Sequence, residues 1–408
     1  MSRSCPECGE SFPDEVFFCG RDGTITVQDQ DPGDFDSRLG KQLGGYIVVA
    51  RVADGAMGRV FEGRHPDTRA RVAIKVLHAD VVQDRVAVER FKREFETVTE
   101  MEHPYIVRVL EFGDTPDASY FMTMEYLVGE ELGKALAPGQ PLPPARVLRL
   151  ACQTAVALEY AHSFGFIHRD LKPDNIFLCE SEDGDEVRIL DFGSVKLQME
   201  LGAKLTAIGT TVGSPFYMSP EQAMGRSDVD QRTDVFALSA IIYEMLTGKV
   251  AFEAPTVAKI LMRIMNDSPD APSQVLLAVP ASVDAVVDRG LRKEKEERYA
   301  TAGELARDLL RAYGLSGDAQ AWARKPVAEI EAALAEAERP PAPQAEPAAS
   351  AEPAMPVAKG PPTQSTLGLA TEDPLTVPAG VGGGGMAKLA LIAVGVLVIG
   401  GVLALLLR

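Results

Sequence analysis

The sequence predicts an α+β protein made of a small cysteine module, one large globular domain and a C-terminal apolar segment. Three of the five cysteines lie within the first twenty residues. Strand-like and helical patterns then alternate without long interruption from Tyr46 to about Tyr313. Near the end, residues 389–407 form a run of nineteen residues without a charge.

Composition limits the functions that are possible. The 408 residues are 46% hydrophobic and 25% charged, which is ordinary for soluble domains with a sizeable core. The formal net charge of -18 argues against nucleic acid as a partner, because binding its phosphates needs a basic face. The cysteines do not form a disulfide framework, and they suit a reducing cytosol. No apolar secretory signal stands at the N-terminus. Cys152 and Cys179 are expected to be small buried hydrophobic residues.

The cysteine module is assigned to residues 1–27. It contains C-x2-C, ten further residues, a third cysteine, and an aspartate where a fourth cysteine would complete a zinc ribbon. The spacing predicts a zinc-ribbon-like module whose Zn²⁺ ligands are Cys5, Cys8, Cys19 and Asp22. The alternative is a metal-free knuckle held together by Phe12, Phe17 and Phe18. No general base lies nearby, so the module is expected to bind a partner or to regulate.

Residues 28–45 are polar, acidic and contain Pro and Gly, which predicts a linker. The stretch "VADGAMGRV" follows at Val52–Val60 and resembles a phosphate-covering loop, G-x-G-x-x-G-x-V, whose first glycine is replaced by Ala53. Gly55 and Gly58 keep the positions where the backbone approaches phosphates most closely. Alone, this motif is weak.

Later in the chain, two charged residues are placed next to segments that are predicted to be buried. Lys75 lies in the apolar strand "RVAIKVLH", where a lysine is costly unless an anion meets it. Taken alone, the pattern favours a lysine on the exposed face of the strand. Glu94 borders the buried stripe of the helical pattern "VERFKREFETVTEM" and is placed to reach Lys75.

The stretch "FIHRDLKPDNIFL" predicts a loop between two apolar segments. It presents Asp170 to accept a proton from a hydroxyl, Lys172 to neutralise phosphate, and Asn175 to offer an amide oxygen to a hard cation. Sixteen residues after Asn175, "VRILDFG" places Asp191 at a strand end, where a carboxylate can bind Mg²⁺.

Together, "VAIK", "HRDLKPDN", "DFG" and "SPE" resemble, in order and spacing, the signature motifs of the eukaryotic-type protein kinase family. The wording of "RFKREFE" and "YMSPEQ" is most similar to bacterial serine/threonine kinases. The resemblance covers residues 46–313 and implies the bilobal protein-kinase fold. Its small β-rich N-lobe would span residues 46–126, and its larger helical C-lobe residues 129–313.

The resemblance also implies roles for single residues. The catalytic residues would be Asp170 as the base, Lys172 on the γ-phosphate, and Lys75 on the α/β-phosphates, paired with Glu94. Asn175 and Asp191 would hold Mg²⁺. ATP would be contacted by the loop positions Ala53, Gly55, Gly58 and Val60, by Ala73 and Lys75, and by the connecting segment Met124, Glu125 and Leu127.

Lys172, two residues after the base, is the choice of serine/threonine kinases in this family, so the resemblance implies Ser/Thr hydroxyls of proteins as substrates. Arg169 precedes the base and is expected to pair with a phosphorylated activation loop. The candidate phosphosites are Thr206, Thr210 and Thr211. Trans-autophosphorylation, and hence self-association, is expected.

Other residues are given structural roles. The resemblance implies that Glu221 pairs with Arg298 and that Asp234 braces the catalytic loop. Isolated histidines usually pack and form hydrogen bonds rather than act as bases. That role is expected for His103, His162 and His168.

After the large domain, residues 314–385 predict a helix in "VAEIEAALAEAER" and then a Pro/Ala/Gly-rich disordered tether. The apolar run at 389–407 would span about 28 Å as a helix, close to the thickness of a bilayer's hydrocarbon core. It predicts a single transmembrane helix, with a buried core helix as the alternative. Since ATP is cytoplasmic, the expected location is the cell inner membrane with the kinase domain in the cytoplasm.

Two rival functions remain open at this stage. A pseudokinase or scaffold would use the fold for partner binding without turnover. An adaptor would depend mainly on the cysteine module. The presence of Lys75, Glu94, Asp170, Asn175 and Asp191 favours the active enzyme.

Overall fold

The structure is a computed structural model of the whole chain. It describes residues 2–30, 36–55, 58–78, 95, 99, 101–117, 119–191 and 215–338, which belong to one compact unit. Several predictions lie outside the described residues. These are Glu94, Thr206, Thr210, Thr211 and the apolar run at 389–407.

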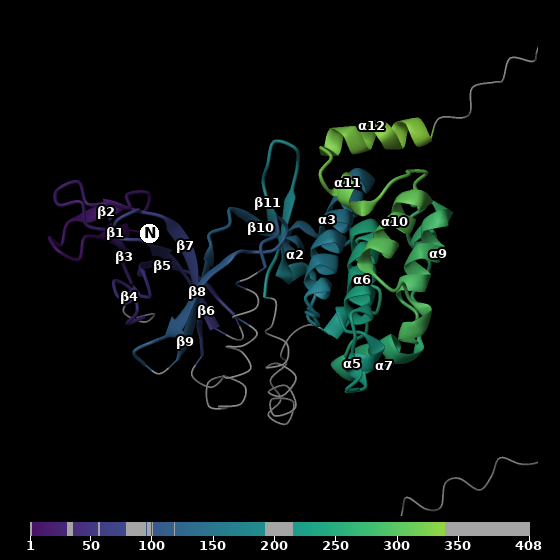
Figure 1. Cartoon of the computed structure of the whole chain (residues 1–408), viewed down its shortest axis with the longest axis horizontal. Coiled ribbons are helices and arrows are strands. Elements are labelled where there is room, and N and C mark those ends of the chain that lie inside the picture. The colour runs from purple at the N-terminus through teal and green to yellow at the C-terminus, as the bar shows by residue number, and fades with distance from the viewer. Residues whose placement is uncertain are drawn as a thin grey trace, which may run out of the picture. The chain divides into compact units, whose positions relative to one another are not determined.

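The first lobe is built on a six-stranded antiparallel sheet (Figure 1). Its strand order is β4-β5-β6-β7-β9-β8. The strands are β4 (Gln42–Leu43), β5 (Tyr46–Asp54), β6 (Gly58–Arg64), β7 (Arg71–Leu77), β8 (Val109–Asp114) and β9 (Tyr120–Glu125). Alternating apolar residues of β5, β6 and β7 give the sheet one buried face, with Val48, Phe61 and Ile74 fully buried at its centre.

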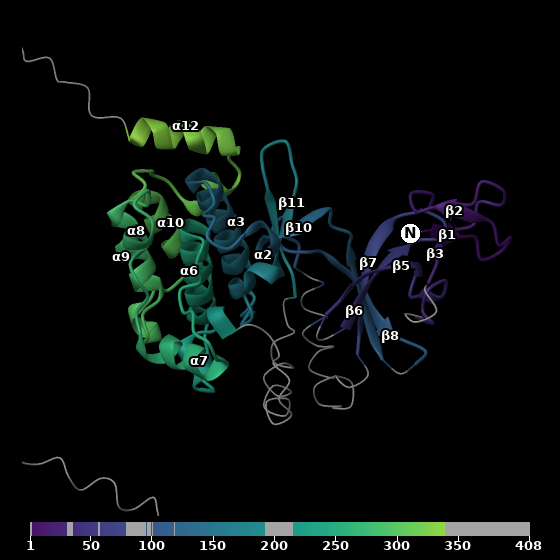
Figure 2. The same cartoon turned by 180° about the vertical axis from the view of Figure 1, so that it is seen from behind.

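The second lobe is mostly helical and carries a small sheet of strand order β10-β11-β12 (Figures 1 and 2). Its strands are β10 (Gly129–Glu131), β11 (Ile176–Cys179) and β12 (Glu186–Ile189). Its helices are α2 (Leu132–Ala135), α3 (Pro144–Ser163), α5 (Pro220–Ala223), α6 (Arg232–Thr247), α7 (Val257–Asn266), α8 (Pro272–Val275), α9 (Ala281–Gly290) and α10 (Ala302–Ala312). The predicted α+β, bilobal architecture is confirmed.

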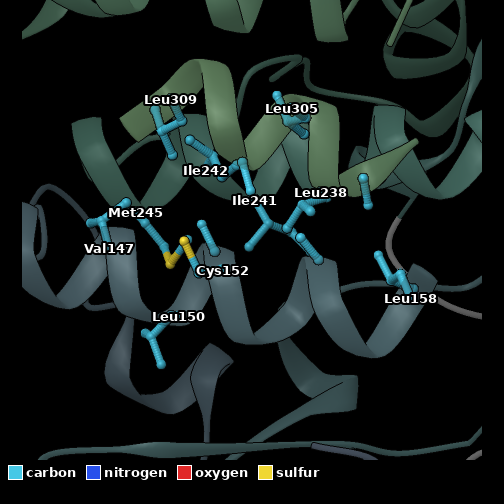
Figure 3. Packing of buried hydrophobic residues seen from close by; sticks show 14 of the residues in the cluster. Val147, Leu150, Cys152, Leu158, Leu238, Ile241, Ile242, Met245, Leu305 and Leu309 are labelled. Carbon is cyan, nitrogen blue, oxygen red and sulfur yellow. The ribbon is translucent and has the colours of Figure 1, made fainter. Parts of the chain in front are cut away.

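The main core of the second lobe lies where α3, α6 and α10 meet (Figure 3). Helix α3 begins with Pro144 at its first position, where a missing N–H does no harm, and its apolar face is continuous. Helix α6 ends at Gly248, whose φ of 70° needs a residue without a side chain. Cys152 points from α3 toward Met245 of α6 and is 1% exposed, as expected for a buried hydrophobic residue, whereas Cys179 is half-buried.

The N-terminal module contains a three-stranded antiparallel sheet of order β2-β1-β3. The strands are β1 (Ser2–Ser4), β2 (Ser11–Pro13) and β3 (Val27–Gln28). Strand β3 lies against β5 of the first lobe. The segment expected to be a linker contributes β4, and its Leu43 is buried in the core of the first lobe.

Two helices follow the second lobe and pack on α3 (Figure 1). They are α11 (Ala319–Ala323) and α12 (Val327–Ala337), and α12 confirms the helix predicted from "VAEIEAALAEAER". Trp322 and Ile330 are buried in the same core as α3. The compact structure therefore continues well past Tyr313.

Among the residues that the structure describes, no helix is both long and apolar enough to cross a membrane.

Candidate active site

The β5–β6 hairpin forms the two sides of the candidate nucleotide loop. Ala53 pairs with Val60 across the hairpin, and the backbone nitrogen of Gly55 donates to the Gly58 carbonyl oxygen at 3.0 Å. A Cβ at Gly58 would overlap the carbonyl oxygen of Val76 on β7. Gly58 is thus required by the sheet itself, in addition to any need for close approach to phosphate.

Lys75 lies in the middle of β7, with its neighbours Val60 on β6 and Met122 on β9. Its Nζ is 2.5 Å from Oδ1 of Asp191, and the lysine side chain is only 12% exposed. The lysine therefore points inward to an anion, so the alternative of an exposed-face lysine is wrong. The partner seen here is Asp191, while the predicted partner Glu94 lies outside the described residues.

Asp191 follows β12 with a φ of 57°, a left-handed conformation that is uncommon for a residue with a side chain. Burial alone would raise the pKa of its carboxyl group. The charge of Lys75 and its hydrogen bond outweigh that effect and lower the pKa below the ordinary value. Asp191 is therefore an ionised carboxylate, as a cation ligand must be.

The catalytic-loop residues meet one another directly. The Nζ of Lys172 lies 2.8 Å from Oδ2 of Asp170. The amide nitrogen of Asn175 donates to the backbone oxygen of Asp170 at 2.7 Å and to its Oδ2 at 3.2 Å. This arrangement fixes the Asp170 carboxylate and leaves the amide oxygen of Asn175 as the atom that can bind a cation.

Asp234 of α6 fixes this loop through hydrogen bonds to its backbone. Its Oδ2 accepts a hydrogen bond from the backbone nitrogen of His168 at 2.8 Å, and its Oδ1 accepts one from that of Arg169 at 2.8 Å. Its Oδ2 also lies 2.7 Å from Nε2 of His162. Arg169 has a φ of 63°, so a strained backbone is held in place just before Asp170. The bracing role of Asp234 is confirmed.

The three histidines have the structural roles expected of them. Nε2 of His168 lies 2.9 Å from the Leu190 carbonyl oxygen. His162 pairs with Asp234, and His103 stacks on Tyr160 with the ring centroids 4.8 Å apart. Nδ1 of His168 also accepts a hydrogen bond from the backbone nitrogen of Asp170 at 3.3 Å. Each ring is thus engaged in packing or in a structural hydrogen bond.

A buried ion pair lies next to a residue that contacts the catalytic loop. Arg298 donates to both carboxylate oxygens of Glu221, at 2.8 and 2.7 Å, and both side chains are at most 3% exposed. This pair confirms the prediction. Next to Glu221, Gln222 donates to the backbone oxygen of Arg169 at 2.6 Å, so helix α5 also contacts the catalytic loop.

The residues expected around an adenine ring come from adjacent strands. Ala73 of β7 pairs with Met124 of β9, and Glu125 ends that strand. The backbone nitrogen of Glu125 donates to the Arg108 carbonyl oxygen at 2.9 Å, which fixes the strand end. Leu127 lies two residues beyond and is half-buried. Their contacts with a nucleotide stay predictions.

A second cluster lies in the N-terminal module, at the positions predicted from spacing. Ligand atoms of Cys5, Cys8, Cys19 and Asp22 all lie within 4.8 Å of one another. Sγ of Cys8 is 3.6 Å from Sγ of Cys19, and Sγ of Cys5 is 3.5 Å from Oδ2 of Asp22. Backbone nitrogens of Cys8 and Arg21 point at the sulfurs of Cys5 and Cys19, at 3.5 and 3.4 Å.

Two features of the site had no sequence signal. Arg59, directly after Gly58, pairs with Asp36 of the presumed linker at 2.9 Å. The Ala323 carbonyl oxygen of α11 accepts hydrogen bonds from Gln153 of α3 and from Tyr105, which precedes β8, both at 3.1 Å. Both depend on residue pairs distant in sequence, and the partner residues belong to no motif.

The arrangement can bind a polyanion and position a hydroxyl beside a base. Lys75 and Lys172 supply positive charge, Asp191 and Asn175 supply oxygen ligands, and Asp170 supplies a fixed carboxylate. Phosphoryl transfer requires this combination of positioning and charge neutralisation.

Comparison with known proteins gives the same assignment. The family model described as "Protein kinase domain" matches residues 46–310. Serine/threonine-protein kinases Pkn1 and pkn2 of Myxococcus xanthus are 39% and 36% identical over 276 and 274 residues, or 67% and 66% of this chain. These alignments cover only 38% and 32% of the relatives' own lengths.

A solved structure agrees with the curated relatives. The PknI kinase domain of Mycobacterium tuberculosis superposes with a TM-score of 0.55 at 26% identity, covering 68% of this chain and 99% of that one. On the family match, these relatives and the site geometry, the chain belongs to the protein kinase family.

Proposed function

We propose that this chain is a serine/threonine protein kinase, which transfers the γ-phosphoryl group of ATP to Ser and Thr hydroxyls of proteins. The observation that carries the proposal is the contact network of Lys75–Asp191 and Asp170–Lys172–Asn175, held on the brace of Asp234. A scaffold without turnover has no use for a carboxylate and a lysine fixed 2.8 Å apart beside a cation site.

The residues present fit Mg²⁺, which prefers oxygen ligands such as the carboxylate of Asp191 and the amide of Asn175. Mg²⁺ would supply charge neutralisation at the phosphates. Asp170 accepts the proton of the substrate hydroxyl, and Lys172 stabilises negative charge on the transferred group. Lys75 orients the remaining phosphates.

The test is Mg-ATP-dependent phosphorylation by the full chain, compared with an Asp170→Asn variant. Loss of the fixed base is expected to lower the rate by about 10²-fold or more. Asp174→Asn, an exposed change in the same loop, is the control and is expected to keep activity near wild type. Equal phosphorylation by the wild type and Asp170→Asn would favour the pseudokinase or scaffold.

For the cysteine cluster we propose a structural Zn²⁺ site. Ligands about 2.1–2.3 Å from a tetrahedral Zn²⁺ lie about 3.4–3.8 Å from one another. The spacings of 3.6 Å between Cys8 and Cys19 and 3.5 Å between Cys5 and Asp22 fit that geometry. Metal analysis of the purified chain should give one zinc, and Cys8→Ser should lower the bound zinc. A zinc-free wild type with an intact module would support the metal-free alternative.

We also propose activation by trans-autophosphorylation between two copies. A phosphate on Thr206, Thr210 or Thr211 would add about -1.5 to -2 charges, which Arg169 can bind next to the base. Mass spectrometry of active enzyme should find phosphate on at least one of these threonines. If all three are unmodified in fully active enzyme, activation does not use them.

Membrane attachment through residues 389–407 completes the proposal, with the kinase domain in the cytoplasm at the inner membrane. The absence of charge over nineteen residues supports it. Removing residues 386–408 should move the protein from the membrane fraction to the supernatant without changing its specific activity. Unchanged fractionation would reject the anchor.

A further inference from the structure

The N-terminal segment contacts the base of the nucleotide loop through a charged residue. Arg59 is the residue after Gly58, at the start of β6. Its Nη1 lies 2.9 Å from Oδ2 of Asp36, and its Nε lies 3.2 Å from Oδ2 of Asp54 at the end of β5. Arg59 therefore ties both strands of the loop hairpin to a residue outside the sheet.

Asp36 is itself fixed by burial and hydrogen bonds, so its contact with Arg59 restricts the position of Arg59. Its side chain is 3% exposed, and its Oδ1 accepts a hydrogen bond from the backbone nitrogen of Arg38 at 3.0 Å. Gln30 bonds the backbone of Asp36 on both sides, accepting from its nitrogen and donating to its oxygen. A carboxylate this buried needs cationic partners, because an unpaired charge there is costly. Arg59 is the nearer one, and Nη1 of Arg38 lies 3.5 Å from the same oxygen.

A second link joins the module to the other strand of the loop. The pairing of β5 with β6 shifts register between Arg51 and Ala53. At this irregularity the backbone nitrogen of Arg51 donates to Oε1 of Gln28, at the end of β3, at 3.1 Å. The Arg51 side chain then pairs with Asp54 at 2.7 Å. The module thus reaches the same aspartate that contacts Arg59.

The cysteine module also contacts the first lobe at the C-terminal end of β6 and in the turn that follows. The guanidinium of Arg64 lies 4.0 Å from the ring centre of Phe17, and that of Arg69 lies 4.2 Å from the ring centre of Phe18. These phenylalanines lie just before Cys19. They therefore contact the kinase lobe, and the ring centre of Phe17 also lies 4.3 Å from the guanidinium of Arg3 within the module.

Polar links connect the two parts beside the loop. An open pocket of about 450 Å³ lies at this junction, lined by Gln28, Asp36 and Leu39 on one side and by Arg51, Val52 and Ala53 on the other. Strand β4 and the buried Leu43 attach the segment at the start of β5, and the contacts of Arg51 and Arg59 attach it at the loop end.

We propose that the N-terminal segment, residues 2–43, positions the nucleotide loop. Asp36 is the positioning residue. A metal-loaded cysteine module thereby raises the affinity for ATP. A loop hairpin held at its base loses less conformational freedom when ATP binds beneath it, so affinity rises without new contacts to the nucleotide. The proposal rests on the proposed ATP binding.

The first test measures binding of a non-hydrolysable ATP analogue with Mg²⁺ to the full chain by calorimetry, together with KM for ATP and kcat. Asp36→Asn is expected to raise the dissociation constant and KM about three- to tenfold, with kcat changed less than about twofold. Asp36→Glu should recover part of the affinity. Asp67→Asn, an exposed change in the turn at the opposite end of β6, should behave as wild type.

A purely structural role for Asp36 would lower thermal stability and leave nucleotide affinity unchanged, and that outcome overturns the proposal. Failure of the wild type to bind the analogue at all would instead reject the proposed kinase function. The two failures are therefore distinguishable.

The second test uses Cys8→Ser, which removes one ligand of the cluster. It should weaken binding of the analogue by a similar factor. Because the link through Asp36 and Arg59 and the link through Gln28 and Arg51 meet at Asp54, the double variant Asp36→Asn/Cys8→Ser should be weakened much less than the product of the two single effects. Fully multiplicative effects, or an unchanged affinity in Cys8→Ser, would show that the module does not act on the loop.

Discussion

At the scale of single residues, the catalytic loop depends on one buried aspartate. Asp234 accepts hydrogen bonds from two consecutive backbone nitrogens and pairs with His162. Three polar groups thus converge on a side chain that lies outside the set of residues expected to contact a substrate. Its effect on catalysis is through the position of Asp170.

Asp234→Asn should lower kcat, because an amide has one oxygen where the carboxylate offers two acceptors. One backbone donor, at His168 or Arg169, then faces an amide N–H. The expected loss is about 10- to 100-fold in kcat, corresponding to about 1.4–2.7 kcal/mol. Asp228→Asn, an exposed change before α6, is the control and should stay within about twofold. Equal kcat values in the two variants would contradict the bracing role.

The Glu221–Arg298 pair should contribute to stability in a pH-dependent way. Burial opposes ionisation of Glu221, but the hydrogen bonds and charge of Arg298 lower its pKa below the ordinary 4.5. A carboxyl group with a lowered pKa stabilises the fold above its unfolded pKa, and this contribution is lost as the pH falls below about 4.5. Glu221→Gln should cost about 3–5 kcal/mol of unfolding free energy at pH 7.

Denaturant titrations at pH 7 and pH 4 measure both effects. The gap between wild type and Glu221→Gln should narrow at the lower pH. A gap that stays constant would mean that the pair's ionisation does not contribute to stability.

Sequence reasoning worked best for residues whose chemistry admits few types. The motifs "HRDLKPDN" and "DFG" predict Asp170 as a base and Asn175 and Asp191 as oxygen ligands. Their roles stay predictions, and the structure shows the contacts of Asp170 with Asn175 and of Asp191 with Lys75. Asp36 gave no signal, since an aspartate in a polar, acidic segment is usually solvated, and only the fold shows it buried against Arg59.

At the scale of elements, the two helices after α10 belong to the second lobe. Arg149 of α3 donates to the Lys325 carbonyl oxygen, and the backbone nitrogen of Val327 donates to the Asp183 carbonyl oxygen at 3.0 Å. The sequence predicted a helix here from its Ala and Glu content. It did not predict docking, because most apolar residues of α12 are alanines and only Val327, Ile330 and Leu334 are larger. Its partner surface on α3 is also distant in sequence.

Ile330→Ala tests the docking of α12. Ile330 is fully buried, so truncation should cost about 2–5 kcal/mol of unfolding free energy by transfer and cavity terms. Leu277→Ala is the control, because Leu277 is 94% exposed and its truncation should change stability by less than about 0.5 kcal/mol. If both variants unfold at the same denaturant concentration, α12 does not contribute to the cooperative unit.

At the scale of the whole molecule, the compact unit is larger than the region that the family model covers. The kinase match spans residues 46–310, whereas the ordered contacts described here begin at β1 and end with α12. Strand β4 and Leu43 complete one lobe, and α11 and α12 complete the other.

A chain of residues 46–310 should therefore melt at a lower temperature than one of residues 2–338. The intermediate chains 2–310 and 46–338 separate the two contributions. Because the extensions contact different lobes, their effects on unfolding free energy should be nearly additive. Equal melting temperatures for the shortest and longest chains would show that neither extension stabilises the domain.

The hydrogen bond between the Tyr105 hydroxyl and the Ala323 carbonyl oxygen spans 218 residues of sequence. During translation at roughly 5–20 residues per second, Ala323 is made about 10–45 seconds after Tyr105. Throughout that interval, the Tyr105 hydroxyl lacks its native acceptor. The nascent kinase domain thus completes the surface of α3 last, and a stop or cleavage before Asp318 would leave that surface permanently open.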